Sequence, residues 1–169
     1  FTDFAERLRW FAKYRPELLR ELSDLTHRGV EDRVRLSLVD TDKLRRILGP
    51  VLDPAGMLSD HGVRSVSRRH HDHPFALELG SDRFTLEYAP AESTTPLFGG
   101  NSNWRGPVWF PINHLVIEAL ERYYEYLGDD FVVECPTGSG VLMNLQEVAD
   151  EIRNRLIRLF LPDADGRRP

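Results

Sequence analysis

The chain has 169 residues, of which 41% are hydrophobic and 29% are charged, as in an ordinary globular domain. Its formal net charge of −5 argues against broad binding to nucleic acid or to anionic membranes, because both require a positive field on the protein. The single cysteine, Cys135, excludes an internal disulfide, and no apolar run is long enough to span a membrane. The lack of disulfides fits an intracellular protein, and we expect a cytoplasmic one, although a secreted protein without disulfides would look the same; no secretion signal is recognisable.

The first third of the chain predicts helices. Apolar residues from Phe4 to Tyr14 recur at helical spacing, and a second helix is expected to begin at Pro16 and to end at Gly29. A third, short helix should have Thr41 as its N-cap and end at Gly49-Pro50.

The clearest β signal follows a segment rich in turn residues, 53–62. Phe75–Leu79 and Phe84–Tyr88 both alternate apolar and polar residues, and the four residues 80–83 separate them. This pattern predicts a hairpin with a four-residue loop.

The remainder of the chain again predicts helices. One should carry apolar residues from Ile112 to Leu127 and end at Gly128, and residues 131–140 are expected to form a loop. The last helix should begin at Asn144, with Glu147 completing a capping box. The expected fold is therefore mainly α with one β-hairpin, and long helices joined by elaborate loops suit a helical toroid.

The segment 99–111 has the composition of a binding loop. It combines two indoles, one guanidinium, two primary amides, three glycines and two prolines. Indole faces stack on apolar C–H surface, while amides and a guanidinium offer donors to hydroxyl groups, a combination that suits sugar recognition. The candidate substrate-binding residues are Trp104, Arg105, Trp109, Asn103 and Asn113.

Three other features carry a weaker chemical signal. The run 64–73 contains three histidines and an aspartate, but adjacent residues rarely point at one ion and no second cluster supplies further ligands, so we expect no metal site and no cofactor. We interpret this run as a solvated or loop-pinning segment. His114 is expected to be a core histidine and Cys135 a small buried thiol.

Glycosidase chemistry needs two carboxylates, roughly 6.5–9.5 Å apart in an inverting enzyme. Four carboxylates lie near the informative loops: Glu92, Glu118, Glu134 and Glu147. Glu147 is assigned to the cap, Glu118 is expected to face solvent, and the other two lie on loops. None stands out as half of a catalytic pair.

The run Asn103-Trp104-Arg105-Gly106-Pro107-Val108-Trp109 resembles the Trp-Arg-Gly-Pro-x-Trp segment of glycoside hydrolase family 63. The resemblance is closest to the bacterial glucosidase-like branch, among the relatives of processing α-glucosidases and mannosylglycerate hydrolases. Five further segments also resemble sequences of this family: 60–65, 71–74, 91–93, 134–140 and 165–169.

The resemblance implies an (α/α)6 toroid and an inverting mechanism without a metal. It implies that Trp104 and Trp109 line the sugar subsite with Arg105 beside them, although many members have tyrosine where this chain has Asn103. The catalytic acid and base of the family lie upstream and downstream of the matching region, so we expect no catalytic residue here. Residues 1–169 then form one segment of a larger catalytic domain, whose partners are the rest of that domain and a carbohydrate substrate.

Two other functions are compatible with the residues. A non-catalytic carbohydrate-binding or interaction module would use the same aromatic loop without belonging to an enzyme. A nucleic-acid binder would use Arg64, Arg68 and Arg69, but this one basic patch has no interleaved aromatic residues and does not outweigh the net negative charge.

Overall fold

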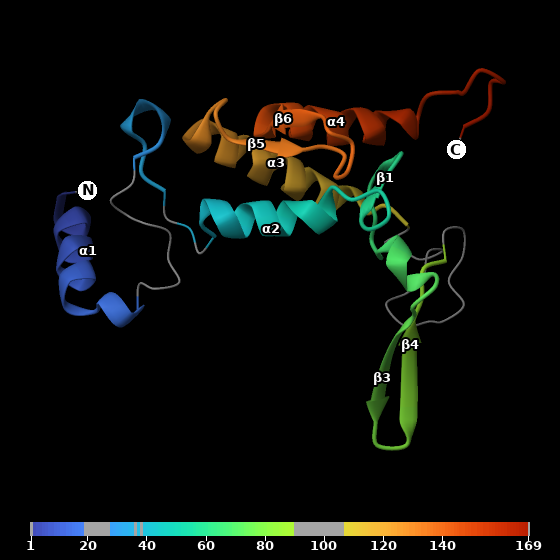
Figure 1. Ribbon diagram of the computed structural model, residues 1–169, viewed down its shortest axis with the longest axis horizontal. Coiled ribbons are helices and arrows are strands. Elements are labelled where there is room, and N and C mark those ends of the chain that lie inside the picture. Colours follow the sequence, from blue (N-terminus) through green and yellow to red (C-terminus); the bar gives the residue numbers. More distant parts are fainter. Residues whose placement is uncertain (1, 19–27, 36, 38, 90–106, 169) are drawn as a thin grey trace.

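The computed structural model of the chain describes residues 2–18, 28–35, 37, 39–89 and 107–168. Within these residues, the regular structure consists of four α-helices, three short 3-10 helices and three antiparallel strand pairs. Helices α2, α3 and α4 lie together with the β5–β6 pair as the body of the molecule (Figure 1). Helix α1 lies apart from this body, and the β3–β4 hairpin projects away from it.

The four helices confirm the predicted positions of four helical segments. They are α1 (Thr2–Tyr14), α2 (Thr41–Val51), α3 (Phe110–Leu127) and α4 (Leu145–Arg158). The helix expected from Pro16 begins only as a 3-10 helix, η1 (Pro16–Leu18), and its continuation over 19–27 lies outside the described residues.

The structure confirms the predicted hairpin, as β3–β4, and adds two short strand pairs. The three pairs are β1 (Leu58–Ser59) with β2 (Gly62–Val63), β3 (Phe75–Leu79) with β4 (Asp82–Leu86), and β5 (Val132–Glu134) with β6 (Leu142–Asn144). The first and third pairs fall where turns and a loop were expected. Strands of two or three residues are too short to show an alternating pattern, so sequence reasoning missed them.

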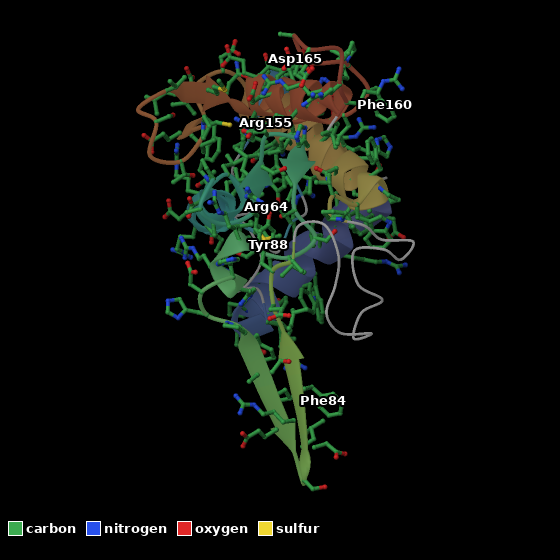
Figure 2. The ribbon with its side chains drawn as sticks, turned by 90° about the vertical axis from the view of Figure 1, so that its right-hand side faces the viewer. Arg64, Phe84, Tyr88, Arg155, Phe160 and Asp165 are labelled. Atoms are coloured by element: carbon green, nitrogen blue, oxygen red, sulfur yellow. The ribbon has the colours of Figure 1, made fainter. Side chains whose placement is uncertain are left out.

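The β3–β4 hairpin has a two-residue loop, not the predicted four-residue one. Leu79 pairs with Asp82, which leaves Gly80 and Ser81 to make the turn. Gly80 adopts a φ of 63°, a value that glycine reaches without steric cost. The apolar side chains alternate onto one face of the hairpin, and that face is exposed, as Phe84 shows in Figure 2.

Both ends of α2 differ from the prediction. Asp40, not Thr41, is the N-cap, because its carboxylate accepts a 2.7 Å hydrogen bond from the Lys43 amide. The helix runs through Pro50 to Val51. A proline in the last turn removes one backbone hydrogen bond close to the point where the helix ends anyway, so it does not stop the helix earlier.

The later helix ends agree with the sequence. Gly128 closes α3 with a φ of 69°. Asn144 and Glu147 form the predicted capping box of α4: the Asn144 side chain accepts from the Glu147 amide at 2.9 Å, and the Glu147 carboxylate accepts from the Asn144 amide at 2.8 Å. His114 corrects another expectation, since it is exposed on α3 and not part of the core.

The hydrophobic core lies between α2, α3, α4 and the short strands. Its most deeply buried members are Leu52, Leu58, Cys135, Leu145, Val148, Ala149 and Ile152. Gly29 lies against α3, because a Cβ atom there would be 2.3 Å from the Tyr126 carbonyl oxygen; the helix that it was expected to close falls on 19–27, outside the described residues. The core thus holds α3 in place, with the first turn of this helix facing β2. The candidate site lies where the first turn of α3 meets β2.

Candidate functional site

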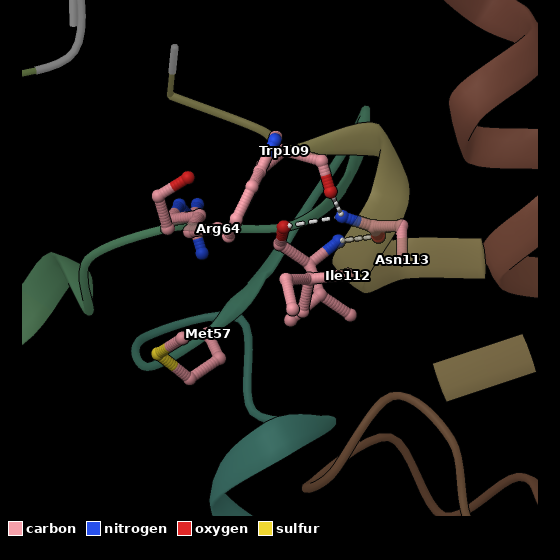
Figure 3. Close-up of a pocket in the computed structure, with 7 residues that line it drawn as sticks. Met57, Arg64, Trp109, Ile112 and Asn113 are labelled. Carbon is pink, nitrogen blue, oxygen red and sulfur yellow. Dashed lines mark hydrogen bonds between the residues drawn. The ribbon is translucent and has the colours of Figure 1, made fainter. Parts of the chain in front are cut away.

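The candidate site lies where the chain enters α3. Trp104, Arg105 and Asn103 are outside the described residues, so the structure places only Trp109 and Asn113 of the predicted substrate-binding set. It brings these two together on the wall of a pocket of about 260 Å³ (Figure 3). The lining residues are Met57, Val63, Arg64, Ser65, Trp109, Ile112 and Asn113.

The pocket has an apolar wall and a polar edge. Trp109 is half-buried and immediately precedes α3, where its backbone is extended. Met57 and Ile112 continue the apolar surface beside the indole, while Arg64 and Ser65 add polar groups. An indole face next to hydrogen-bonding groups matches the requirements of a ligand that has both C–H surface and hydroxyls.

Asn113 holds the frame of the pocket. The residue is 1% exposed, and its side chain pairs with the backbone of β2: Oδ1 accepts from the Val63 amide at 2.7 Å, and Nδ2 donates to the Val63 carbonyl at 2.9 Å. Nδ2 also donates to the Trp109 carbonyl at 3.0 Å. Both amide donors are therefore engaged by the protein, and the side chain ties the first turn of α3 to β2.

Arg64 joins the pocket to the turn before β1. Its Nη1 donates to the carbonyls of Pro54 at 3.1 Å, Gly56 at 3.2 Å and Leu58. The guanidinium carbon lies 5.8 Å from the centre of the Tyr88 ring, at the base of the β3–β4 hairpin (Figure 2). This confirms the loop-pinning interpretation for Arg64 and places the residue in the candidate site as well.

Two further hollows adjoin Arg64. One, of about 390 Å³, is lined by Ser59, His61, Arg64, Tyr88, Pro107, Val108 and Leu159. The other, of about 510 Å³, is lined by Arg64, Arg68, His71, Asp72 and Tyr88. All three pockets share Arg64, so they surround one side chain, and Tyr88 supplies a second aromatic surface next to it.

Carboxylates near the site have other partners or face solvent. Glu134 accepts hydrogen bonds from the Gly138 and Gly140 amides, which hold the pKa of this carboxyl below its usual range. Glu147 caps α4, and Glu118 is exposed on α3. Glu92 lies outside the described residues. None of the three described carboxylates lines the Trp109 pocket.

The one carboxylate on an adjoining hollow is Asp72. It pairs with His71 at 2.8 Å, and this hydrogen bond lowers the pKa of Asp72. A catalytic general acid needs a raised pKa, so Asp72 does not suit that role. Among the described residues, no group of three or more histidine, cysteine, aspartate or glutamate side chains is arranged to hold a metal ion.

Cys135 is buried, as the sequence predicts. Burial is the main cause that raises the pKa of its thiol to about 11, so little of it is the reactive thiolate at neutral pH. In the part of the chain that the structure describes, no helix is long and apolar enough to cross a membrane.

Sequence reasoning missed Met57 and Tyr88 as site residues and treated Arg64 as part of a surface segment. A signal for Arg64 was present, because the family-like run 60–65 contains it. Met57 and Tyr88 carry no such signal, and only the folding of β1, β2 and the hairpin base brings them beside the start of α3.

Two yeast proteins are similar to this chain. "Uncharacterized protein YMR196W" of Saccharomyces cerevisiae is 47% identical over 169 residues, which is 99% of this chain and 16% of the yeast protein. The mannosyl-oligosaccharide glucosidase of the same organism is 29% identical over 86 residues, 50% of this chain and 7% of the glucosidase. The chain thus spans about a sixth of the length of the first of these relatives.

No protein-family model matches the chain, and no solved structure matches it. The comparisons therefore link half of the chain to part of a glucosidase, a coarser result than the family resemblance that the motifs carry.

Proposed function

We propose that the chain is the substrate-binding segment of an inverting α-glycosidase of the family 63 type. The enzyme would act on an α-glucosidic bond of an oligosaccharide or a simple glucoside. The observation that carries the proposal is the partial similarity to the mannosyl-oligosaccharide glucosidase, since it agrees with the Trp-Arg-Gly-Pro-x-Trp motif. The Trp109 pocket supports it with an aromatic surface beside polar groups.

In this proposal the described residues bind and orient a sugar. Trp109 provides the stacking face, with Met57 and Ile112 beside it, and Arg64 and Ser65 lie near the sugar hydroxyls. Trp104, Arg105 and Asn103 are proposed to complete the subsite. Asn113 acts as a positioning residue, because its hydrogen bonds to Val63 and Trp109 fix the wall on which the indole is mounted.

The acid and the base are proposed to come from other parts of a longer protein. An inverting enzyme needs one carboxylic acid to protonate the leaving oxygen and one carboxylate to activate water on the opposite side of the sugar. Glu134 and Glu147 are committed to the backbone, and the Trp109 pocket has no carboxylate among its lining residues. The (α/α)6 toroid is likewise proposed for the longer protein, with α1 to α4 as part of its helices.

Hydrolysis by the longer protein tests the proposal. We expect the natural full-length protein to hydrolyse an α-glucoside and to release the β-anomer first, as followed by proton NMR during the first turnovers. The 169-residue chain alone should show no turnover. Turnover by the chain alone, abolished by changing one of its own carboxylates, would contradict the assignment of the acid and base to other segments.

The alternative function is a non-catalytic carbohydrate-binding or interaction module. The exposed apolar face of the β3–β4 hairpin is the observation that favours an interaction role, because large exposed apolar patches often mark contact sites. Sugar binding by the chain, combined with an absence of hydrolysis by the full-length natural protein, would favour this alternative.

A further inference from the structure

A second charged pocket lies on the other half of α3. Residues 28–35 pack against this half: Gly29 approaches Tyr126, and Arg33 Nη1 donates to the Glu125 carbonyl at 2.9 Å. Arg35 follows, and its guanidinium carbon lies 5.2 Å from the centre of the Tyr123 ring and 4.8 Å from the centre of the Tyr126 ring. Two aromatic rings therefore hold this guanidinium in place.

Two of the three nitrogens of the Arg35 guanidinium have no hydrogen-bond acceptor among the described residues. Its Nε and Nη1 atoms are buried, and no described residue accepts a hydrogen bond from them. Aromatic rings attract a cation but do not replace the acceptor oxygens that a guanidinium binds in water. Because these two atoms have essentially no exposed surface, an oxygen acceptor in the pocket would bind the third nitrogen, Nη2, and would be attracted by the charge of the guanidinium.

Arg35 also lines a pocket that has room for such a ligand. The pocket has a volume of about 290 Å³ and is lined by Arg35, Ser37, Ala119, Arg122 and Tyr123. Arg122 adds a second cation. Its Nη1 atom donates to the two carboxylate oxygens of Glu125, at 3.1 and 3.2 Å. Glu125 offsets much of the Arg122 charge, so Arg35 is the main source of positive charge among the lining residues.

Two other lining residues, Ser37 and Tyr123, are held by hydrogen bonds. The Ser37 hydroxyl donates to the Val39 carbonyl at 3.1 Å and lies 2.9 Å from the Tyr123 hydroxyl. These contacts fix the Tyr123 ring on which Arg35 stacks, so the guanidinium is oriented before any ligand arrives. A pre-oriented guanidinium favours a charged oxygen acceptor, such as one from a phosphate or a carboxylate.

We propose that this pocket binds a small oxyanion, the phosphate or carboxylate group of a small molecule, through Arg35 and Arg122. The proposal does not depend on the sugar site. Asn113 and Tyr123 are ten positions apart, which corresponds to about 15 Å along the helix. Anion binding at Arg35 and sugar binding at Trp109 can therefore succeed or fail separately.

Thermal unfolding of the chain tests the proposal, with inorganic phosphate and acetate as probes at constant ionic strength. We expect a saturable, phosphate-dependent rise in Tm, because a ligand that binds only the folded state stabilises it. Arg35→Lys keeps the charge but loses the stacked fork, and it should weaken phosphate binding at least about tenfold, the effect of one charged hydrogen bond. Arg158→Gln removes an exposed arginine of α4 and serves as the matched control.

A second variant avoids the stacked guanidinium altogether. Ala119→Glu places a carboxylate in the pocket at an exposed helical position, and it should raise the Tm in the absence of phosphate and abolish the response to phosphate. A response to acetate as well as phosphate would identify a site for carboxylates too. The proposal is wrong if no saturable response occurs, or if phosphate raises the Tm of Arg35→Lys and Ala119→Glu as much as that of the control.

Discussion

Replacing Asn113 by alanine should destabilise the chain far more than the loss of one polar side chain from a surface would. The side chain is 1% exposed and bonds both the amide and the carbonyl of Val63, a residue that is itself only 6% exposed. In the variant these two backbone groups lose their partners and stay away from water. The Trp109 carbonyl keeps one partner, because the Asn113 backbone amide also donates to it at 3.1 Å.

The magnitude follows from these two orphaned groups. Each buried and unsatisfied group lowers the free energy of unfolding by about 1–3 kcal/mol. The higher helix propensity of alanine raises it by about 0.5 kcal/mol. We therefore expect Asn113→Ala to lower the free energy of unfolding by about 2–5 kcal/mol.

Equilibrium urea unfolding measures this difference. The matched control is Asn154→Ala, which removes an exposed asparagine from α4 and should change the free energy of unfolding by less than about 0.5 kcal/mol. If the two variants have the same free energy of unfolding within that margin, the amide of Asn113 does not hold α3 to β2, and the reasoning fails.

Three other predictions concern buried or buttressing groups. Arg155→Met should lower the free energy of unfolding by about 2–4 kcal/mol in urea, because Arg155 is 8% exposed and Nε binds Glu151 at 2.7 Å, whereas the exposed Arg158→Met should change little. Two loop amides lower the pKa of Glu134, so the ionised carboxylate stabilises the folded chain fully above the ordinary carboxyl pKa of 4.5. This contribution to the free energy of unfolding is lost as the pH falls below 4.5, and the difference in Tm between the wild type and Glu134→Gln should shrink in that range. Cys135 should react slowly with iodoacetamide at pH 8 in the folded chain and rapidly in urea, and fast labelling of the folded chain would contradict its burial.

The sequence predicts the helices best, since their signals are long. Periodic apolar residues locate α3 and α4, and Gly128 and the Asn144–Glu147 pair mark their ends through local backbone chemistry. Short elements are different, because β1 and β2 have two residues each, and β2 bonds to Asn113 of α3, which is distant in the sequence. The loop length of the hairpin was missed because register is set by pairing, and Leu79 pairs with Asp82.

The candidate site was predictable in composition but not in arrangement. Trp109 and Asn113 were identified from the sequence motif. The hydrogen bond between Asn113 and Val63 could not be predicted in this way, because the two residues are 50 positions apart. Arg64 lies in the family-like run 60–65, but its position in the site is seen only from its three carbonyl partners and the adjoining pockets. Trp104 and Arg105, the centre of the motif, lie outside the described residues, and their place in a sugar subsite stays a prediction.

The kcat/KM of the full-length natural protein on an α-glucoside tests the central claim most directly, by comparing Trp109→Ala with Trp10→Ala. Trp10 is 59% exposed on α1 and does not line the pocket, so both variants lose an indole but only one loses the proposed stacking surface. We expect Trp109→Ala to lower kcat/KM about tenfold, because an aromatic contact with a ligand contributes up to about 1.5 kcal/mol in the transition state. The Trp10 variant should keep its activity, and equal kcat/KM values for the two variants would remove Trp109 from the sugar site.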